Sequence, residues 1–363
     1  MHVDGDHRPV RCRGPQVGDA EPDRHQEPAE PGALAQFRDQ PRAFLHQAEA
    51  FCALLSGGEP PGQHHVVVGP RDLVLDRQEP AVGVRVRFAQ APYAWMTDFV
   101  GWLPMPDGGD REGALTTDFN AEMIEQVARF PSLRDRSVFV GNPDDVVPDA
   151  FGEGLPLIRD WVEENYRFSG YVSGISAGEL DDRAALRAGL GYQDGEQVCV
   201  VTVGGSGVGT DLLRRAGAAF PAAKRLVPGL RMIVTAGPRI DPGPLASIPS
   251  RDGLEVRGYV PDLYRHLAAC DLAVVQGGLT TTMELTASQR PFIYVPLRHH
   301  FEQNFHVRHR LARYGAGRCR DYEQTTPEVL ASAMAEEISR PVSYRPVETD
   351  GAARAAACLA ELI

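Results

Sequence analysis

The chain has 363 residues, 43% of them hydrophobic and 24% charged, which is the composition of a globular protein large enough for two domains. Its formal net charge of −12 argues against broad attraction to nucleic acid or anionic lipid. We find no run of about 20 apolar residues that could span a bilayer, and no apolar segment after a charged start. We therefore expect no transmembrane segment and no signal peptide. The six cysteines form no Cys-x-x-Cys pair, which favours the reducing cytoplasm and no bound metal.

Residues 1–90 differ in character from the rest of the chain. They are rich in Arg, Pro, Gly, Gln and His, and show almost no helical or strand periodicity. Such sequence buries too little apolar surface to fold alone. Two interpretations stay open: a disordered extension, or the off-frame translation of a GC-rich gene in which Lys224 is the only lysine. We therefore expect an aberrant or disordered N-terminal segment.

Regular patterns begin at Tyr93. A strand is expected over Tyr93–Asp98, a helix over Ala121–Phe130, and a short strand over Ser137–Val140. Asp98 stands at the polar tip of the first strand. It is the one candidate for a catalytic base that we name, although an aspartate in that position more often caps a loop.

Beyond Phe168, strand and helix patterns alternate at short intervals, which predicts a doubly wound parallel sheet of the α/β class. Ligands of such sheets bind at the carboxyl ends of the strands. The expected strands are Gln197–Val203, Arg231–Thr235, Leu254–Tyr259, Leu272–Val275 and Phe292–Val295. The expected helices are Asp211–Ala219, Leu263–Cys270, Thr281–Ser288 and His306–Tyr314.

A glycine-rich loop, Gly204–Gly209, lies between a predicted strand and a predicted helix. Glycines let a phosphate approach the backbone, and the following helix N-terminus supplies free N–H groups. Tight packing is the alternative explanation for such glycines. The loop does not fit Gly-x-Gly-x-x-Gly, since Thr210 stands at the third glycine position, and no acidic residue ends the next strand. Dinucleotide binding is therefore disfavoured.

Two further segments follow predicted strands. Gly277 and Gly278 precede three threonines that could cap a helix and donate hydroxyls, and Glu284 lies about one turn further on. A carboxylate there could hold both hydroxyls of a ribose, or could be a capping-box residue that stabilises the helix start. The polar run Arg298–Asn304 follows the strand that ends near Pro296. It predicts either a binding site or a merely solvated loop.

The spacing of these motifs resembles the donor domain of GT-B glycosyltransferases, most of all glycosyltransferase family 28, and in its later part the UDP-glycosyltransferase superfamily. The resemblance covers about residues 171–340. It implies an α/β GT-B fold of two Rossmann-like, doubly wound domains, the N-terminal one incomplete or aberrant. Residues 91–170 would be the remainder of the acceptor-binding domain, residues 171–345 the nucleotide-sugar donor-binding domain, and residues 346–363 a C-terminal helix. The motifs are Gly204–Gly207, Gly258–Leu263, Cys270–Leu272, Gln276–Gly278 with Glu284, Pro291, Pro296 and Glu302–Asn304.

The same resemblance implies roles for individual residues. Gly205 and Ser206 would face the diphosphate, and the backbone of Tyr259 and Val260 would border a uracil or thymine base. Glu284 would hold the ribose. The phosphates would be cradled by Gly277, Gly278, Thr280 and Thr281, and the sugar hydroxyls would be contacted by Glu302 and Gln303. Gln276 stands where many relatives have a histidine, so it can donate a hydrogen bond but no charge.

The implied activity is an inverting, metal-independent transfer of a sugar from a UDP- or TDP-sugar to an acceptor hydroxyl or amine. We expect no cofactor beyond the donor. The acceptor would be a small molecule or a lipid-linked compound, and peripheral membrane contact stays open. We find no Gly-His loop after a strand in residues 1–60, where relatives carry a base or acceptor site. Two alternatives are therefore kept: a non-catalytic donor-binding subunit or degraded enzyme, and a UDP-sugar 2-epimerase with carboxylates from both domains.

Overall fold

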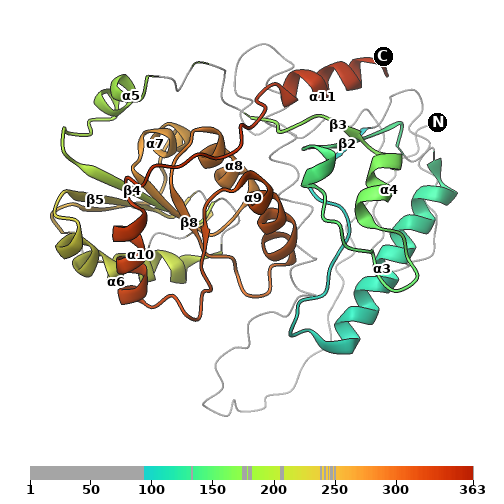
Figure 1. The fold of residues 1–363 in the computed structure, drawn as a ribbon, viewed down its shortest axis with the longest axis horizontal. Coiled ribbons are helices and arrows are strands. Elements are labelled where there is room, and N and C mark those ends of the chain that lie inside the picture. Colours follow the sequence, from blue (N-terminus) through green and yellow to red (C-terminus); the bar gives the residue numbers. More distant parts are fainter. Residues whose placement is uncertain are drawn as a thin grey trace, which may run out of the picture.

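The computed structural model describes residues 94–131, 134–173, 178, 182–204, 208–237, 239–240, 243, 245, 248 and 251–362. The predicted N-terminal segment 1–90 lies outside these residues, as do Gly205 and Ser206. The described residues form two parallel β-sheets, each with its own helices, and the two units lie side by side in Figure 1. We call residues 94–170 the first unit and residues 182–345 the second unit.

The first unit contains a three-stranded parallel sheet in the order β1-β2-β3. Its strands are β1 (Ala94–Thr97), β2 (Arg136–Phe139) and β3 (Arg167–Phe168), and its helices are α3 (Gly109–Arg129), η2 (Pro143–Asp145) and α4 (Ile158–Asn165). The two strands predicted here are confirmed, while α3 starts earlier than predicted. Buried Asn120 fixes α3 in place, because its amide donates to the carbonyl oxygens of Trp102 and Phe151 at 2.8 and 2.7 Å.

The second unit contains six parallel strands in the order β6-β5-β4-β7-β8-β9. Numbered along the chain from β4, this order is 3-2-1-4-5-6, that of a Rossmann sheet. The five predicted strands are therefore confirmed, and the two-residue strand β9 was not predicted. Their bounds are β4 (Gln197–Thr202), β5 (Leu230–Thr235), β6 (Leu254–Arg257), β7 (Leu272–Val275), β8 (Phe292–Tyr294) and β9 (Arg318–Cys319).

Helices cover both faces of this second sheet. Cys199 and Val201 of β4 face the core made with α6 and α10, whereas Val198 and Val200 face the core made with α7, α8 and α9. A strand buried on both faces explains the continuous apolar run at this position. The helices are α5 (Arg183–Gly189), α6 (Thr210–Leu226), α7 (Leu263–Ala269), α8 (Leu279–Ala287), α9 (Arg308–Tyr314) and α10 (Pro327–Glu337), and a π-helical turn η4 (Glu302–Val307) precedes α9.

The last helix, α11 (Gly351–Ala360), crosses back to the first unit, where Figure 1 shows it beside β2 and β3. Arg136, the first residue of β2, donates to the carboxylate of Glu361 at 2.8 Å. Gly351 leaves room for the crossing, because a Cβ there would lie 2.2 Å from the carbonyl oxygen of Tyr171. In the part of the chain that the structure describes, no helix combines the length and the apolar character needed to cross a membrane.

Candidate nucleotide-sugar site

The crevice of the second sheet lies between β4 and β7, where the strand order reverses direction. In a Rossmann sheet this switch point is where ligands bind, at the carboxyl ends of the strands. The predicted loops at Gly204–Gly209 and Gln276–Glu284 follow these two neighbouring strands. The fold therefore brings together two motifs that lie about 70 residues apart in the sequence.

The loop after β4 approaches the loop after β7 through Gly209. This glycine is the N-cap of α6, with φ of 105°, a left-handed conformation that favours glycine. A Cβ at Gly209 would lie 2.8 Å from Cβ of Val203 and 2.9 Å from Nε2 of Gln276. Only a glycine at position 209 therefore allows the two loops to approach this closely.

Gln276 points a hydrogen-bond donor into this contact. Its side chain is 2% exposed, and among the described residues Nε2 has no hydrogen-bond partner. An amide nitrogen left unpaired in this way costs free energy, which a ligand oxygen can recover by accepting its hydrogen bond. Gln276 is thus placed to donate a hydrogen bond to a polar ligand at the switch point.

The N-cap of α8, Gly278, is exposed, and a Cβ there would have nothing within 4 Å. No described side chain makes a cap hydrogen bond to this helix. The first N–H groups of an α-helix point out of its N-terminus and favour an anion there. Thr280 is exposed and Thr281 half-buried beside these groups, while the Thr282 hydroxyl is used internally and donates to the Gly278 carbonyl at 3.0 Å.

Glu284 is a half-buried carboxylate in the second turn of α8, and burial raises its pKa to about 7. Its carboxylate makes no hydrogen bond or ion pair with another described residue, whereas its backbone carbonyl accepts from the Ser288 hydroxyl at 2.7 Å. The capping-box alternative is wrong, because Glu284 is the sixth residue of α8 and no described side chain bonds the N-cap. Buried Tyr171 lies nearby: its hydroxyl donates to the Thr280 carbonyl at 3.2 Å, and Glu284 raises its pKa.

A second carboxylate, Glu302, opens the π-helical turn η4 after β8, and its charge interacts with that of Asp98, the residue after β1. Burial and the negative charge of Asp98 raise the pKa of Glu302 to about 8, against the opposing charge of Arg310. Asp98 sits in a turn that Thr97 fixes, since its hydroxyl donates to the Phe99 carbonyl at 2.6 Å. Carboxylates from the two units therefore converge in one place.

Gln303 shapes the loop that carries Glu302. It is 6% exposed, and its side-chain oxygen accepts the N–H of Leu297 at 3.0 Å, while Asn304 donates to the Leu297 carbonyl at 2.7 Å. The alternative of a merely solvated loop does not hold for this residue. His300 in the same loop is half-buried. Burial lowers the pKa of its imidazole to about 4, which keeps the imidazole neutral near pH 7.

The two residues predicted to border the base follow β6, two strands away from β4 in the sheet. Val260 is 5% exposed, whereas the Tyr259 side chain is 63% exposed and points to solvent. Only the backbone of this loop is therefore suited to a base. The predicted contacts of Gly205 and Ser206 lie outside the described residues.

Asp271, within the Cys270–Leu272 motif, has a structural role at the opposite end of the sheet. Its carboxylate accepts hydrogen bonds from the Val198 N–H at 2.8 Å, from Arg183 at 2.6 Å and from Arg187 at 3.0 Å. These bonds attach α5 to the amino ends of β4 and β7. A family motif thus contains a residue that builds the sheet and lies away from the site.

Sequence reasoning missed the residues of η4 and α9 that reach the first unit. Arg310 donates to the carbonyl oxygens of Asp98 and Val140, and the buried imidazole of His306 bonds the Gly101 carbonyl at 3.1 Å. Burial lowers the pKa of His306 to about 3, so the imidazole is neutral and Nε2 donates. The basic residues of this helix gave no signal, because a charged helix usually faces solvent.

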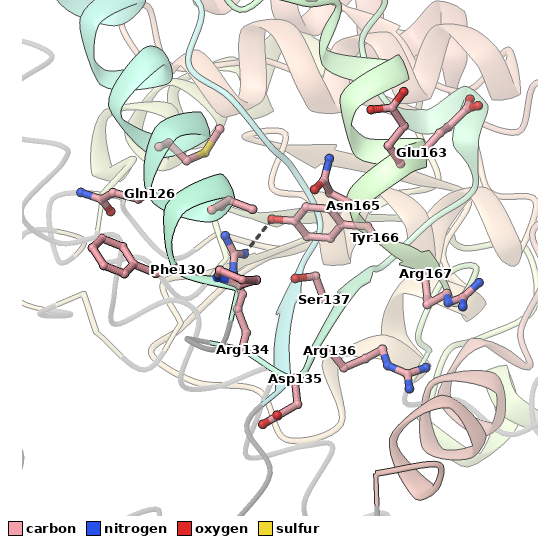
Figure 2. A pocket seen from close by; sticks show the side chains of 14 residues that line it. Gln126, Phe130, Arg134, Asp135, Arg136, Ser137, Glu163, Asn165, Tyr166 and Arg167 are labelled. Atoms are coloured by element: carbon pink, nitrogen blue, oxygen red, sulfur yellow. Dashed lines mark hydrogen bonds between the residues drawn. The ribbon is translucent and has the colours of Figure 1, made fainter. Parts of the chain in front are cut away.

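A cavity of about 460 Å³ lies elsewhere, between the C-terminal ends of α3 and α4 and the amino ends of β2 and β3. Figure 2 shows Arg134 at its wall, donating to the Tyr166 hydroxyl at 3.1 Å. This cavity is at the wrong end of the strands for a Rossmann-type ligand. Within the described residues, no group of three or more His, Cys, Asp or Glu side chains could hold a metal ion.

These features define an α/β protein with two parallel sheets, the second of them in Rossmann order. Residues 198–361 match the glycosyltransferase family 28 C-terminal domain. The resemblance predicted from the motifs is therefore confirmed for this part of the chain.

Two curated relatives and one solved structure illustrate the similarity. An uncharacterized glycosyltransferase of Methanopyrus kandleri is 31% identical over 186 residues, 50% of each chain. One of Methanosarcina acetivorans is 28% identical over 123 residues, 34% of this chain and 31% of the relative. The glycotransferase of kitacinnamycin has a TM-score of 0.44 at 19% identity, over 74% of this chain and 66% of that one. The chain thus spans half the length of the first relative and about a third of the second.

Proposed function

We propose that the chain transfers a sugar from a UDP- or TDP-sugar to an acceptor hydroxyl or amine, with inversion and without a metal ion. The observation that carries this proposal is at the switch point, where the buried Gln276 Nε2 lacks a described partner and the N-terminus of α8 follows two residues later. A diphosphate provides the acceptor oxygens and negative charge that both groups require.

The donor would lie across the carboxyl ends of the second sheet. Gly277, Gly278, Thr280 and Thr281 would receive the phosphates, together with Gly205 and Ser206. Glu284 would accept hydrogen bonds from both ribose hydroxyls, and the backbone at Tyr259 and Val260 would border the base. The sugar would then point toward Glu302 and Gln303, and toward the first unit, which would hold the acceptor.

The chemistry needs a base on the acceptor side. The acceptor oxygen or nitrogen attacks the anomeric carbon, its proton passes to Asp98, and the bond from that carbon to the diphosphate oxygen breaks. Because the pKa of Glu302 is raised to about 8, Glu302 keeps its proton near neutral pH, and Asp98 is the carboxylate that we propose as the base. The electron pair leaves on the diphosphate, which the N-termini of α6 and α8 and the amide of Gln276 stabilise.

Calorimetric titration with UDP and TDP tests the donor site directly. Glu284→Ala is expected to weaken binding by at least about 100-fold, because two hydrogen bonds to a charged group, each worth about 1.5 kcal/mol or more, are lost. Glu336→Ala is the matched control, since that exposed carboxylate lies at the far end of α10. Equal binding with and without magnesium is expected. Wild-type affinity in Glu284→Ala would show that Glu284 does not bind the ribose. No binding of UDP or TDP by the folded wild type would refute the proposed function.

Donor binding is also expected to depend on pH through Glu284. Its raised pKa of about 7 means that the free protein carries a neutral carboxyl below that pH. The ribose hydroxyls are expected to bind the ionised form, so affinity should fall as the pH drops below 7, by up to about tenfold per unit. UDP-glucose is the suitable probe, because its diphosphate does not titrate in this range. Glu284→Gln should abolish this pH dependence, and an unchanged slope in that variant would contradict the assignment.

The alternative functions are distinguished by the products that each would form. Convergence of Asp98 and Glu302 from the two units is what a UDP-sugar 2-epimerase would require, but the family match is to a glycosyltransferase domain. A screen of small-molecule and lipid-linked acceptors with UDP- and TDP-sugars would give a glycosylated product, an epimerised donor, or binding without turnover. The first outcome supports the proposal. We place the reaction in the cytoplasm, with peripheral membrane contact if the acceptor is lipid-linked.

A further inference from the structure

Arg310 is a fully buried arginine that crosses from the second unit to the first. It is 1% exposed on α9, and its guanidinium leaves that helix to reach two strands of the other sheet. Nη1 donates to the Val140 carbonyl and Nη2 to the Asp98 carbonyl, both at 3.1 Å. Both carbonyls lie just beyond the carboxyl ends of β1 and β2.

The rest of the guanidinium is also satisfied by the first unit. Nε lies 4.0 Å from Oδ1 of Asp145, and both side chains are 2% exposed. Gly141 makes room for this contact, because a Cβ at its φ of 152° would lie 2.9 Å from Arg310 Nη2. These partners hold the buried guanidinium in one position.

Arg310 is also a cation beside the acidic groups of the site. Its charge opposes the rise in the pKa of Glu302 caused by burial and by Asp98, and it opposes the rise for Tyr171 caused by burial, Glu284 and Asp98. Two other basic residues of this helix bind η2 of the first unit. Arg313 on α9 pairs with Asp145 at 2.7 Å, and His309 bonds the Asp144 carbonyl.

We infer that Arg310 is a positioning residue for the proposed transfer, because it holds the tip of β1 so that the Asp98 carboxylate faces Glu302 and the donor. This inference rests on the proposed function. An ion pair alone would join the two units, as Arg313 shows, but would not fix the backbone at the base. The bond from Arg310 to the Asp98 carbonyl does so directly.

The test compares Arg310→Met and Arg310→Lys with Arg313→Met, a matched variant three residues along the same helix. Turnover is measured as hydrolysis of UDP-glucose and TDP-glucose, in which water replaces the acceptor. Arg310→Met should bind UDP with wild-type affinity but lose about 100-fold in turnover, because a small displacement of a base is costly. The acidic limb of its pH profile should move to higher pH, since a cation beside the carboxylates is gone. In Arg310→Lys the acidic limb of the pH profile should stay near its wild-type position, because the cation is kept.

Amide hydrogen exchange gives a readout that does not depend on turnover. Residues 97–101 should exchange faster in Arg310→Met than in Arg313→Met. If Arg310→Met matches Arg313→Met in both exchange and turnover, the inference is overturned. It is also overturned if Arg310→Met and Arg310→Lys both fail to fold, because the residue then serves the fold alone. If the wild type binds UDP without turnover, the proposed function fails, and the exchange comparison alone decides whether Arg310 fixes the tip of β1.

Discussion

Asp98→Asn is expected to lower sugar transfer by about 100- to 10,000-fold, the range that a general base contributes. Asparagine has nearly the same shape but cannot accept the acceptor's proton. Arg310 bonds the backbone carbonyl of residue 98, so the variant keeps the turn in place. UDP affinity should stay within about twofold of wild type, because the nucleotide binds the other unit. The measurement is kcat with a saturating donor and acceptor.

Removing the Asp98 charge has a second expected effect. Asp98 raises the pKa of Glu302, so in Asp98→Asn that pKa should fall. Glu302 would ionise at lower pH, and the variant should be at least as stable as wild type near pH 8 because like charges no longer face each other. Asp118→Asn, an exposed change on α3, is the control for both measurements. Transfer at the wild-type rate by Asp98→Asn would show that the base lies elsewhere.

Much of the second unit could be predicted because its signals are local. The continuous apolar run of β4 and the glycines around Gly209 and Gly278 identify strands followed by glycine-containing turns and helices. Glycine placement reflects backbone conformation and close approach, and both are encoded within a few residues. Thr326 and Pro327 are also a local pattern for the start of α10, since the threonine hydroxyl caps the helix by accepting the Val329 N–H.

Contacts between the units could not be predicted in this way. Arg310, His306 and Asp98 are more than 200 residues apart at their farthest, and their meeting depends on how two separate sheets pack. The same is true of α11, whose alanine-rich sequence predicts a helix but gives no indication of the sheet it covers. Asp271 shows that a residue within a motif of the resemblance can fix the sheet at the end opposite the site.

Gly278→Val tests the most exposed part of the proposed site. The residue has φ of −66° and ψ of 141°, which valine adopts readily, and its Cβ would meet open space. Folding stability should therefore change by no more than about 0.5 kcal/mol. The added side chain would stand at the N-terminus of α8, where the diphosphate must approach the backbone, so UDP binding should weaken by about 100-fold.

Gly189→Val provides the matched control, because Gly189 also faces open space but lies at the end of α5, away from the switch point. The two variants are compared by calorimetric titration with UDP and by thermal unfolding. Loss of binding in Gly278→Val alone, with both unfolding midpoints near wild type, would locate the phosphates at α8. Unchanged binding in both variants would mean that α8 does not receive the diphosphate, and the unpaired amide of Gln276 would need another ligand.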